Sequence, residues 1–354
     1  MERLRRPQRG LWGAVLLAGL LSGCAIDGPQ SIFNHAGPIA RAQGELFIYI
    51  FWFAVGVFAV VTAALVYTVV RYRRRGDDTV PEQVHGVAWL EALWTAAPAV
   101  ILVLIGVPTV SLIFATERRI EPTEADLHVN VTGYQWWWQF EYPELGITTA
   151  NELHIPTHRR IVLHLHSGDV LHSFWVPRLA GKRDLIPNQD NQLWFIAEEP
   201  GTYYGQCAEL CLGAHAYMRF RVIASDEASF RAWAADFQGA AQTVAQTLGA
   251  EAAAGRELFK TKGCATCHAV AGYAEGQKGP DLTHFGQRTT LAAGWVENTP
   301  ENLAAWLRDP QAIKPGNYMP TLWAPDDPNR DAEIAALVAY LHSLGRKGEQ
   351  QAQR

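Results

Sequence analysis

GQCAELCLGAHAYM, residues 205–218, places two thiols, an imidazole and a thioether within twelve residues of one another. Soft thiolate and thioether sulfur combined with imidazole is a ligand set that favours copper over hard cations. Two cysteines four residues apart can each bridge two metal ions. His172 and His215 then remain as one terminal ligand for each ion, with Met218 and a backbone carbonyl as weak axial groups. The pattern predicts a dinuclear copper centre that shares one electron between two equivalent metals.

Cys207 and Cys211 have two other interpretations, a disulfide and a zinc site. A Cys-x3-Cys pair in an exported domain could oxidise to a bridge, but His172, His215 and Met218 would then have no role. Zinc has no use for a thioether ligand. The donor set as a whole therefore favours copper.

The same residues resemble a known metal site. Cys-x3-Cys-x3-His-x2-Met after Tyr-Tyr-Gly-Gln, with Val-Leu-His-Ser upstream, is similar to the CuA site of cytochrome c oxidase subunit II. The resemblance implies that Glu209 gives its backbone carbonyl to one copper. It also implies that the carboxylate of Glu209 faces a magnesium site shared with subunit I.

The N-terminal segment, residues 1–23, has the pattern of an export signal. Four arginines precede an apolar run of eleven residues, 11–21, which is too short to span a bilayer. The segment ends in Leu-Ser-Gly-Cys24, which resembles a bacterial lipobox and predicts that Cys24 is acylated. The alternative is an ordinary, uncleaved start of the chain.

Residues 24–120 are predicted to form a transmembrane hairpin. The runs 46–70 and 92–115 are apolar and long enough to cross a bilayer. Between them lies Arg71-Tyr-Arg73-Arg74-Arg75, and clustered arginine in a short loop places that loop in the cytoplasm. Everything after residue 115 is then expected on the outer face of a bacterial cell membrane.

Glu91 is the carboxylate at the inner mouth of the second span, in Trp89-Leu-Glu91-Ala-Leu-Trp94. One interpretation is a plain interfacial charge beside a tryptophan belt. The segment also resembles the part of subunit II whose glutamate lies at the entrance of a proton pathway, which gives Glu91 that role by resemblance.

Residues 121–225 change to short apolar runs separated by turn residues. The segments 127–131, 161–166, 193–197 and 219–223 alternate with period two, which predicts strands. Strands at this spacing indicate an all-β Greek-key sandwich, and the family resemblance implies the cupredoxin-like form. Four further histidines are expected to face solvent rather than metal: His154, His158, His164 and His166.

Tyr134-Gln-Trp136-Trp137-Trp138-Gln-Phe140 is an aromatic cluster that must lie at least partly in the core. The matching family segment contains the exposed tryptophan through which electrons reach CuA, and by that alignment it is Trp136. The domain carries more acidic than basic side chains, so it could steer a cationic donor.

Residues 226–248 are rich in alanine and glutamine and are predicted to form a partly helical linker. The last domain, 249–345, contains Cys264-Ala-Thr-Cys267-His268, the attachment motif of a c-type haem. A zinc knuckle is the competing interpretation of this motif. Residues 346–354 are predicted to be a disordered tail.

The sixth haem ligand is expected to be Met319. The chain has three methionines: Met1 is removed with the signal, and Met218 is assigned to copper. His284 is the competing sixth ligand. A His/Met pair raises the reduction potential, which suits electron transfer. Lys278-Gly-Pro280 resembles the loop whose proline carbonyl orients the haem-ligating histidine.

Taken together, the segments resemble subunit II of the cytochrome-c-fused (caa-type) haem-copper oxidases. The resemblance implies an all-α class I cytochrome c domain and an electron path from a soluble or membrane cytochrome c, through haem c and CuA, to the oxygen-reducing subunit I. It implies subunits I and III and membrane lipid as partners. The net charge of −5 argues against nucleic acid. The alternatives are a stand-alone membrane-anchored carrier and the electron-accepting subunit of a nitric or nitrous oxide reductase.

Overall fold

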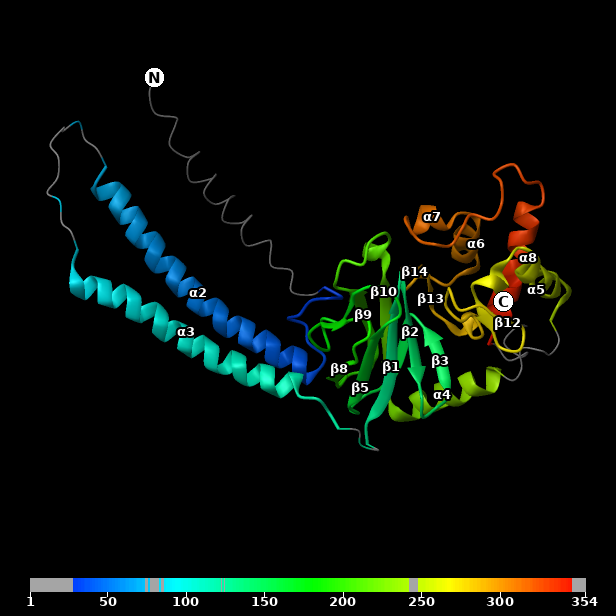
Figure 1. Cartoon of the computed structure of the whole chain (residues 1–354), viewed down its shortest axis with the longest axis horizontal. Coiled ribbons are helices and arrows are strands. Elements are labelled where there is room, and N and C mark those ends of the chain that lie inside the picture. The colour runs from blue at the N-terminus through cyan, green and yellow to red at the C-terminus, as the bar shows by residue number, and fades with distance from the viewer. Residues whose placement is uncertain are drawn as a thin grey trace, which may run out of the picture.

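The structure, a computed structural model, describes residues 28–73, 76, 83, 86–121, 123, 125–241 and 248–345. A long helical hairpin, a β-sandwich and a compact helical domain follow one another along the chain (Figure 1). The predicted fold class is therefore confirmed. The predicted signal peptide, Cys24 and the tail after residue 345 lie outside the described residues.

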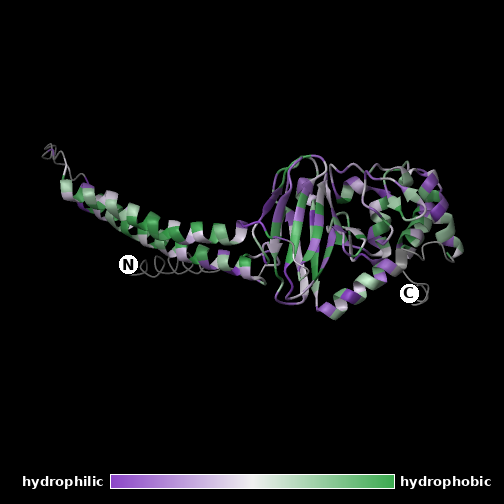
Figure 2. Ribbon diagram, turned by 60° about the horizontal axis from the view of Figure 1, so that its bottom comes forward, coloured by the Kyte–Doolittle hydropathy of each residue, from purple (hydrophilic) through white to green (hydrophobic). Residues whose placement is uncertain are grey.

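Helices α2 (Pro38–Arg71) and α3 (Ala88–Glu117) form the hairpin. Each contains a window of mean hydropathy 2.4 that is not buried inside the protein, and Figure 2 shows the hydrophobic residues along both helices. At 1.5 Å per residue the two helices are about 51 and 45 Å long, which exceeds the hydrocarbon core of about 30 Å. Both are long and apolar enough to cross a membrane, and they contain the predicted spans.

The first turns of α2 belong to the sandwich. Ala36 and Ile39 are buried in the sandwich core. The N–H of Ala36 donates to the carbonyl of Arg178 (2.8 Å), and the N–H of Glu198 donates to the carbonyl of Ala36 (2.9 Å). Large exposed apolar side chains on α2 start at Phe47. The hairpin and the sandwich are thus joined by packing as well as by the chain.

The sandwich consists of two five-stranded sheets with the orders β3-β2-β1-β5-β8 and β4-β10-β9-β6-β7. Its strands are β1 (Leu127–Tyr134), β2 (Trp137–Tyr142), β3 (Ile147–Ala150), β4 (Glu152–Pro156), β5 (Ile161–Ser167), β6 (His172–Trp175), β7 (Arg183–Leu185), β8 (Asn191–Phe195), β9 (Gly201–Cys207) and β10 (Arg219–Ser225). The four predicted strands overlap β1, β5, β8 and β10. Side chains of Trp138, Phe140, Phe174 and Phe220 fill the core and are fully buried.

Helix α4 (Glu227–Ala241) packs against the sandwich through Phe230, Trp233 and Phe237. The ring of His154 stacks on Trp233 with centroids 4.2 Å apart, and the side chain is half-buried. The expectation that His154 faces solvent is therefore wrong, because α4 covers that face. The segment predicted as a linker is partly a packed helix.

The last domain is mainly helical and has two short hairpins. Its elements are α5 (Ala250–Thr261), η2 (Cys264–Thr266), β11 (Ala269–Val270), β12 (Ala274–Glu275), η3 (Phe285–Gln287), β13 (Thr290–Leu291), β14 (Val296–Glu297), α6 (Pro300–Arg308), α7 (Pro310–Ile313) and α8 (Arg330–Ser343). Helices α5 and α8 pack on each other around Phe259 and Tyr340, which are 1% exposed. The domain lies against the side of the sandwich opposite the hairpin (Figure 1).

Candidate copper and haem sites

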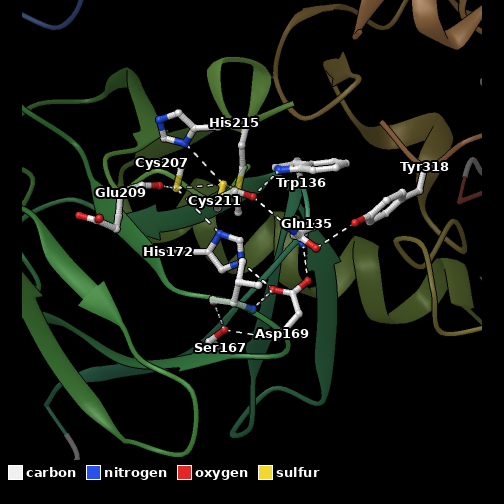
Figure 3. Close-up of polar contacts among 12 residues, drawn as sticks. Gln135, Trp136, Ser167, Asp169, His172, Cys207, Glu209, Cys211, His215 and Tyr318 are labelled. Atoms are coloured by element: carbon white, nitrogen blue, oxygen red, sulfur yellow. Dashed lines mark hydrogen bonds and ion pairs between the residues drawn. The ribbon is translucent and has the colours of Figure 1, made fainter. Parts of the chain in front are cut away.

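The side chains predicted as metal ligands come together in one cluster (Figure 3). Strand β6 supplies His172, and β9 ends at Cys207. The loop that follows, with the short helix η1 (His215–Tyr217), supplies Cys211, His215 and Met218. The N–H of Cys207 donates to the carbonyl of Met218 at 2.9 Å. This hydrogen bond joins the two ends of the loop beside the cluster.

The two sulfur atoms lie at the centre of this cluster. Cys207 Sγ and Cys211 Sγ are 3.8 Å apart, and both cysteines are free. His172 Nδ1 lies 3.9 Å from Cys207 Sγ. His215 Nδ1 lies 3.4 Å and Met218 Sδ 3.8 Å from Cys211 Sγ. One imidazole faces each thiol, which is the arrangement expected for a bridged pair of metals.

The chemistry of these donors fits copper. A hydrogen bond from Cys211 lowers the pKa of Cys207 well below its usual value, so one of the two thiols readily becomes a thiolate. Metal ligands must be deprotonated, and thiolate with imidazole and thioether is a soft donor set. Among the described residues, one group of three or more His, Cys, Asp or Glu side chains is close enough to hold a metal: His172, Cys207 and Cys211.

Asp169 orients His172 and was missed in the sequence. Its Oδ1 lies 2.7 Å from His172 Nε2, so that nitrogen carries the proton and Nδ1 is left to face the sulfur cluster. Burial alone would lower the pKa of His172, but hydrogen bonds with Cys207 and Asp169 raise it. Asp169 Oδ2 also accepts from the N–H of Gln135 at 2.6 Å. An acidic residue three positions before a predicted ligand histidine is the sequence signal that could have indicated the role of Asp169.

Glu209 presents its backbone rather than its side chain to the cluster. Its carbonyl oxygen lies 3.2 Å from Cys207 Sγ, and Figure 3 shows the carboxylate pointing away from the sulfur atoms. The neighbouring side chains of Leu210 and Leu212 are 72% and 65% exposed. An apolar surface of this kind beside a redox site suits contact with another protein.

A cavity of about 740 Å³ is lined by Cys264, Cys267, His268 and Met319 of the helical domain, and it extends to Gln135 and Trp136 of the sandwich. This volume is in the usual range for a cofactor site. His268 Nδ1 is 2.8 Å from the carbonyl of Pro280, which leaves Nε2 for a metal. A Cβ on Gly279 would lie 2.5 Å from the imidazole, so only glycine lets this loop support His268. The residues fit a c-type haem.

Of the two candidate sixth ligands, Met319 lines the cavity and His284 does not. The ring of His284 instead stacks on Phe237 of α4, with centroids 3.5 Å apart. Arg288, which the sequence analysis missed, is buried and also lines the cavity. Its guanidinium donates to the carbonyl of Asp281, and its charge could pair with a haem carboxylate.

Trp136 lies between the two sites. Its Nε1 donates to the carbonyl of Cys211 at 3.0 Å, and a Cβ on Gly213 would lie 2.2 Å from the indole. The expected exposure is wrong, because the side chain is 5% exposed. The ring of Tyr318 covers it, with centroids 4.6 Å apart.

Buried polar contacts hold the helical domain on the sandwich. Glu152 of β4 is 1% exposed and accepts four hydrogen bonds, from the N–H and hydroxyl groups of Thr289 and Thr290, at 2.7–2.9 Å. Arg221 donates to the carbonyl of Gly294 at 2.6 Å. The two domains therefore meet in one defined orientation.

Lys314 is a buried cation in the same interface. Its Nζ donates to the carbonyl of Trp136 at 2.6 Å, and the side chain is 4% exposed. Burial lowers its pKa to about 7. The cation therefore ties the haem domain to the backbone of the residue that contacts Cys211.

Glu91 lies apart from both sites, in the first turn of α3, at the end of the hairpin far from the sandwich (Figure 1). The structure places no other predicted site residue near it among the described residues.

Comparison with known proteins covers most of the chain. The profile described as "Cytochrome C oxidase subunit II, transmembrane domain" matches residues 29–112. The profile for the "periplasmic domain" of the same subunit matches residues 146–225, and the profile "Cytochrome c" matches residues 252–345.

Three relatives are similar over different lengths. Cytochrome c oxidase subunit 2 of Alkalihalophilus pseudofirmus is 40% identical over 92% of this chain and 93% of that protein. The subunit of the same description from Bacillus subtilis is 37% identical over 94% and 98%. Quinol oxidase subunit 2 of Bacillus cereus is 31% identical over 62% of this chain and 76% of its own length.

Proposed function

The chain belongs to the cytochrome c oxidase subunit II family, with a copper domain and a fused cytochrome c domain, and we propose the residues by which it passes electrons. Cys207 and Cys211 would hold the two coppers of a CuA centre between them. His172 and His215 would each supply one further ligand, and Met218 and the carbonyl of Glu209 would be weaker donors. The donors within 3.4–3.9 Å of the two sulfurs support this assignment.

In the cytochrome domain, Cys264 and Cys267 would hold the haem covalently, while His268 and Met319 would bind its iron. When bound, the haem and the copper pair each supply a one-electron carrier. The chain's own residues set the conditions: Pro280 fixes the tautomer of His268, and Asp169 fixes that of His172. Most of the proposed copper donors are buried, so a change of charge at that site is felt strongly.

Electrons pass from a donor cytochrome c to the haem, from the haem past Trp136 to CuA, and from CuA to subunit I. The observation that carries this order is the position of Trp136. Its indole donates to the carbonyl of the ligand Cys211, and its ring is closed off from solvent by the loop that holds Met319. A soluble donor cannot dock on a buried ring, so it delivers electrons to the haem.

The chain is a membrane protein with an outward-facing domain. We propose that α2 and α3 both span the membrane with their connecting loop in the cytoplasm, and that Cys24 carries a lipid. Glu91 then lies at the cytoplasmic end, at the entrance of a proton path. Leu210 and Leu212 face the partner subunit I, Glu209 contributes to a magnesium site there, and subunit III completes the complex.

The exposed leucines beside the copper site favour this role over a stand-alone carrier, which has no subunit to cover them. Reporter fusions test the topology. A reporter that is active only outside should be silent when fused at Asp78 and active when fused at Thr123. The reverse result would invert the proposed orientation.

Stopped-flow absorbance at the haem and copper bands tests the electron order in the full chain. In Trp136→Ala, we expect haem reduction by the donor to stay fast and the following haem-to-copper step to slow. In Met319→Leu, we expect the haem to stay attached with a lowered potential, because the thioether favours ferrous iron. If Trp136→Ala slowed haem reduction itself, the tryptophan would not lie between the two centres.

A further inference from the structure

The haem domain contributes its own aromatic ring to the contact with Trp136. Tyr318 lies on the loop between α7 and α8, directly before Met319, and lines the haem cavity. Its ring is tilted by 38° to the indole of Trp136 at a centroid distance of 4.6 Å. The side chain is 71% exposed, so burial of the tyrosine does not explain the position of its ring.

A second link runs from the same tyrosine to the same copper ligand. The hydroxyl of Tyr318 donates to Gln135 Oε1 at 3.0 Å. Gln135 Nε2 donates in turn to the carbonyl of Cys211 at 2.9 Å. The indole of Trp136 donates to that carbonyl at 3.0 Å. Two routes of contact therefore leave Tyr318 and converge on one oxygen atom (Figure 3).

The loop is held in this position from both sides. The side chain of Asn317 accepts from the N–H of Met319 at 2.7 Å and donates to the carbonyl of Lys314 at 2.6 Å. A Cβ on Gly316, which has a φ of +81°, would lie 3.3 Å from the backbone of Gly213 on the copper loop. The placement of Tyr318 follows from backbone packing between the domains.

We propose that Tyr318 is the bridge through which electrons cross from the haem to the copper centre, with Gln135 as its positioning residue. This inference rests on the proposed function. One electron leaves the haem iron and one arrives at the copper pair, so iron is oxidised and copper is reduced. No bond forms or breaks, and the tyrosine keeps its proton, because its ring serves only as the medium between two carriers.

The test compares three variants of the full, cofactor-loaded chain. An electron is delivered to the haem by a photoexcited ruthenium complex, and haem reoxidation and copper reduction are followed by absorbance. In Tyr318→Leu, we expect the transfer to slow on the order of tenfold, which equals about 1.4 kcal/mol in the barrier. Tyr318→Phe keeps the ring against Trp136 and loses the link through Gln135, so its rate should fall between those of the unmodified chain and Tyr318→Leu.

Trp295→Leu is the matched control. Trp295 is also an aromatic of the haem domain, in edge-to-face contact with Tyr217 of the copper domain at a centroid distance of 4.6 Å, but it does not line the haem cavity. We expect its transfer rate to stay near that of the unmodified chain. An equal loss in Trp295→Leu and Tyr318→Leu, or an unchanged rate in Tyr318→Leu, would overturn the proposal.

Two measurements separate bridging from simple loosening of the interface. The midpoint potentials of both centres, and the enhancement of copper spin relaxation by the ferric haem, should be the same in Tyr318→Leu as in the unmodified chain. A weakened relaxation enhancement would show that the domains have moved apart and would overturn a bridging role. A different result would contradict the proposed function itself: the unmodified chain would lack a mixed-valence copper signal or a c-type haem spectrum.

Discussion

The copper site and the haem site are built in opposite ways. The proposed copper ligands belong to a packed interior: His172 and Met218 are fully buried, and Cys211 is 1% exposed. The proposed haem ligands line a cavity of about 740 Å³. Protein interiors contain few voids larger than a water molecule, so a bound haem would complete the packing of a domain whose own core includes Phe259 and Tyr340. The sandwich, in contrast, has a complete core of its own to which copper is added.

Removing both haem attachments should show the largest effect of this difference. In a chain with Cys264→Ala and Cys267→Ala, we expect the haem domain to lose its cooperative thermal transition, because the haem is no longer held in the core. The sandwich should melt as before. Scanning calorimetry of the purified chain measures both transitions. Cys264→Ala alone keeps one covalent link and serves as the control, and an intact haem-domain transition in the double variant would contradict the comparison.

Removing a copper bridge should destroy the metal centre and leave the fold. In Cys211→Ser, we expect the mixed-valence EPR signal to disappear, because a hydroxyl cannot bridge two coppers as a thiolate does. Circular dichroism of the sandwich should stay unchanged. Met218→Leu is the control, and it should keep two coppers at an altered potential. A delocalised signal with full copper content in Cys211→Ser would refute the ligand assignment.

The contact between the two regions can be weakened without touching either site. Glu152→Ala leaves the donors of Thr289 and Thr290 without their buried acceptor, and we expect docking to weaken by about 3 kcal/mol. Limited proteolysis within residues 226–248 should then become faster. Glu141→Ala removes an exposed carboxylate from β2 and should leave the proteolysis rate as it was. Equal rates for the two variants would mean that Glu152 does not hold the domains together.

A pH dependence of stability is expected as well, spread over several pH units. The pKa of Lys314 is lowered by burial from its usual 10.5 to about 7, so between these values the unfolded chain binds more protons than the folded chain. The free energy of unfolding should therefore rise with pH from about 7 to 10.5, by at most about 1.4 kcal/mol per pH unit. Below pH 7 this contribution is constant. Denaturant titrations at several pH values measure it.

Lys314→Met is the variant for that measurement, because it removes the titrating group and keeps a side chain of similar length. The difference between the two pH profiles isolates Lys314 from other groups that titrate in this range. If the free energy of unfolding varied with pH in the same way in both chains, the pKa of Lys314 would not be lowered by burial.

The sequence predicted what depends on neighbours along the chain. Four of the proposed copper donors fall in one stretch, and the Cys-x-x-Cys-His motif is contiguous, so both sites were visible as patterns. Other contacts join distant segments: Asp169 meets Gln135 within the sandwich, and Glu152 meets Thr289 across 137 positions. No local pattern marks the second pair, because it forms only when the two domains dock.

The same limit explains the two errors. Trp136 was expected to be exposed and His154 to face solvent. The loop around Tyr318 covers the first and α4 covers the second. Burial of a residue on a domain surface depends on what the rest of the chain places over it.

Because the start of α2 is packed into the sandwich, insertions and deletions in the helix have a different effect from substitutions. Ala36 and Ile39 are fixed in the sandwich core, and the same helix continues without a break into its apolar part. One residue inserted between Ile39 and Phe47 would rotate the sandwich by about 100° around the helix axis and shift it by about 1.5 Å. Substitutions in this short segment are tolerable as long as packing is kept, whereas insertions and deletions would turn the copper site away from its partner.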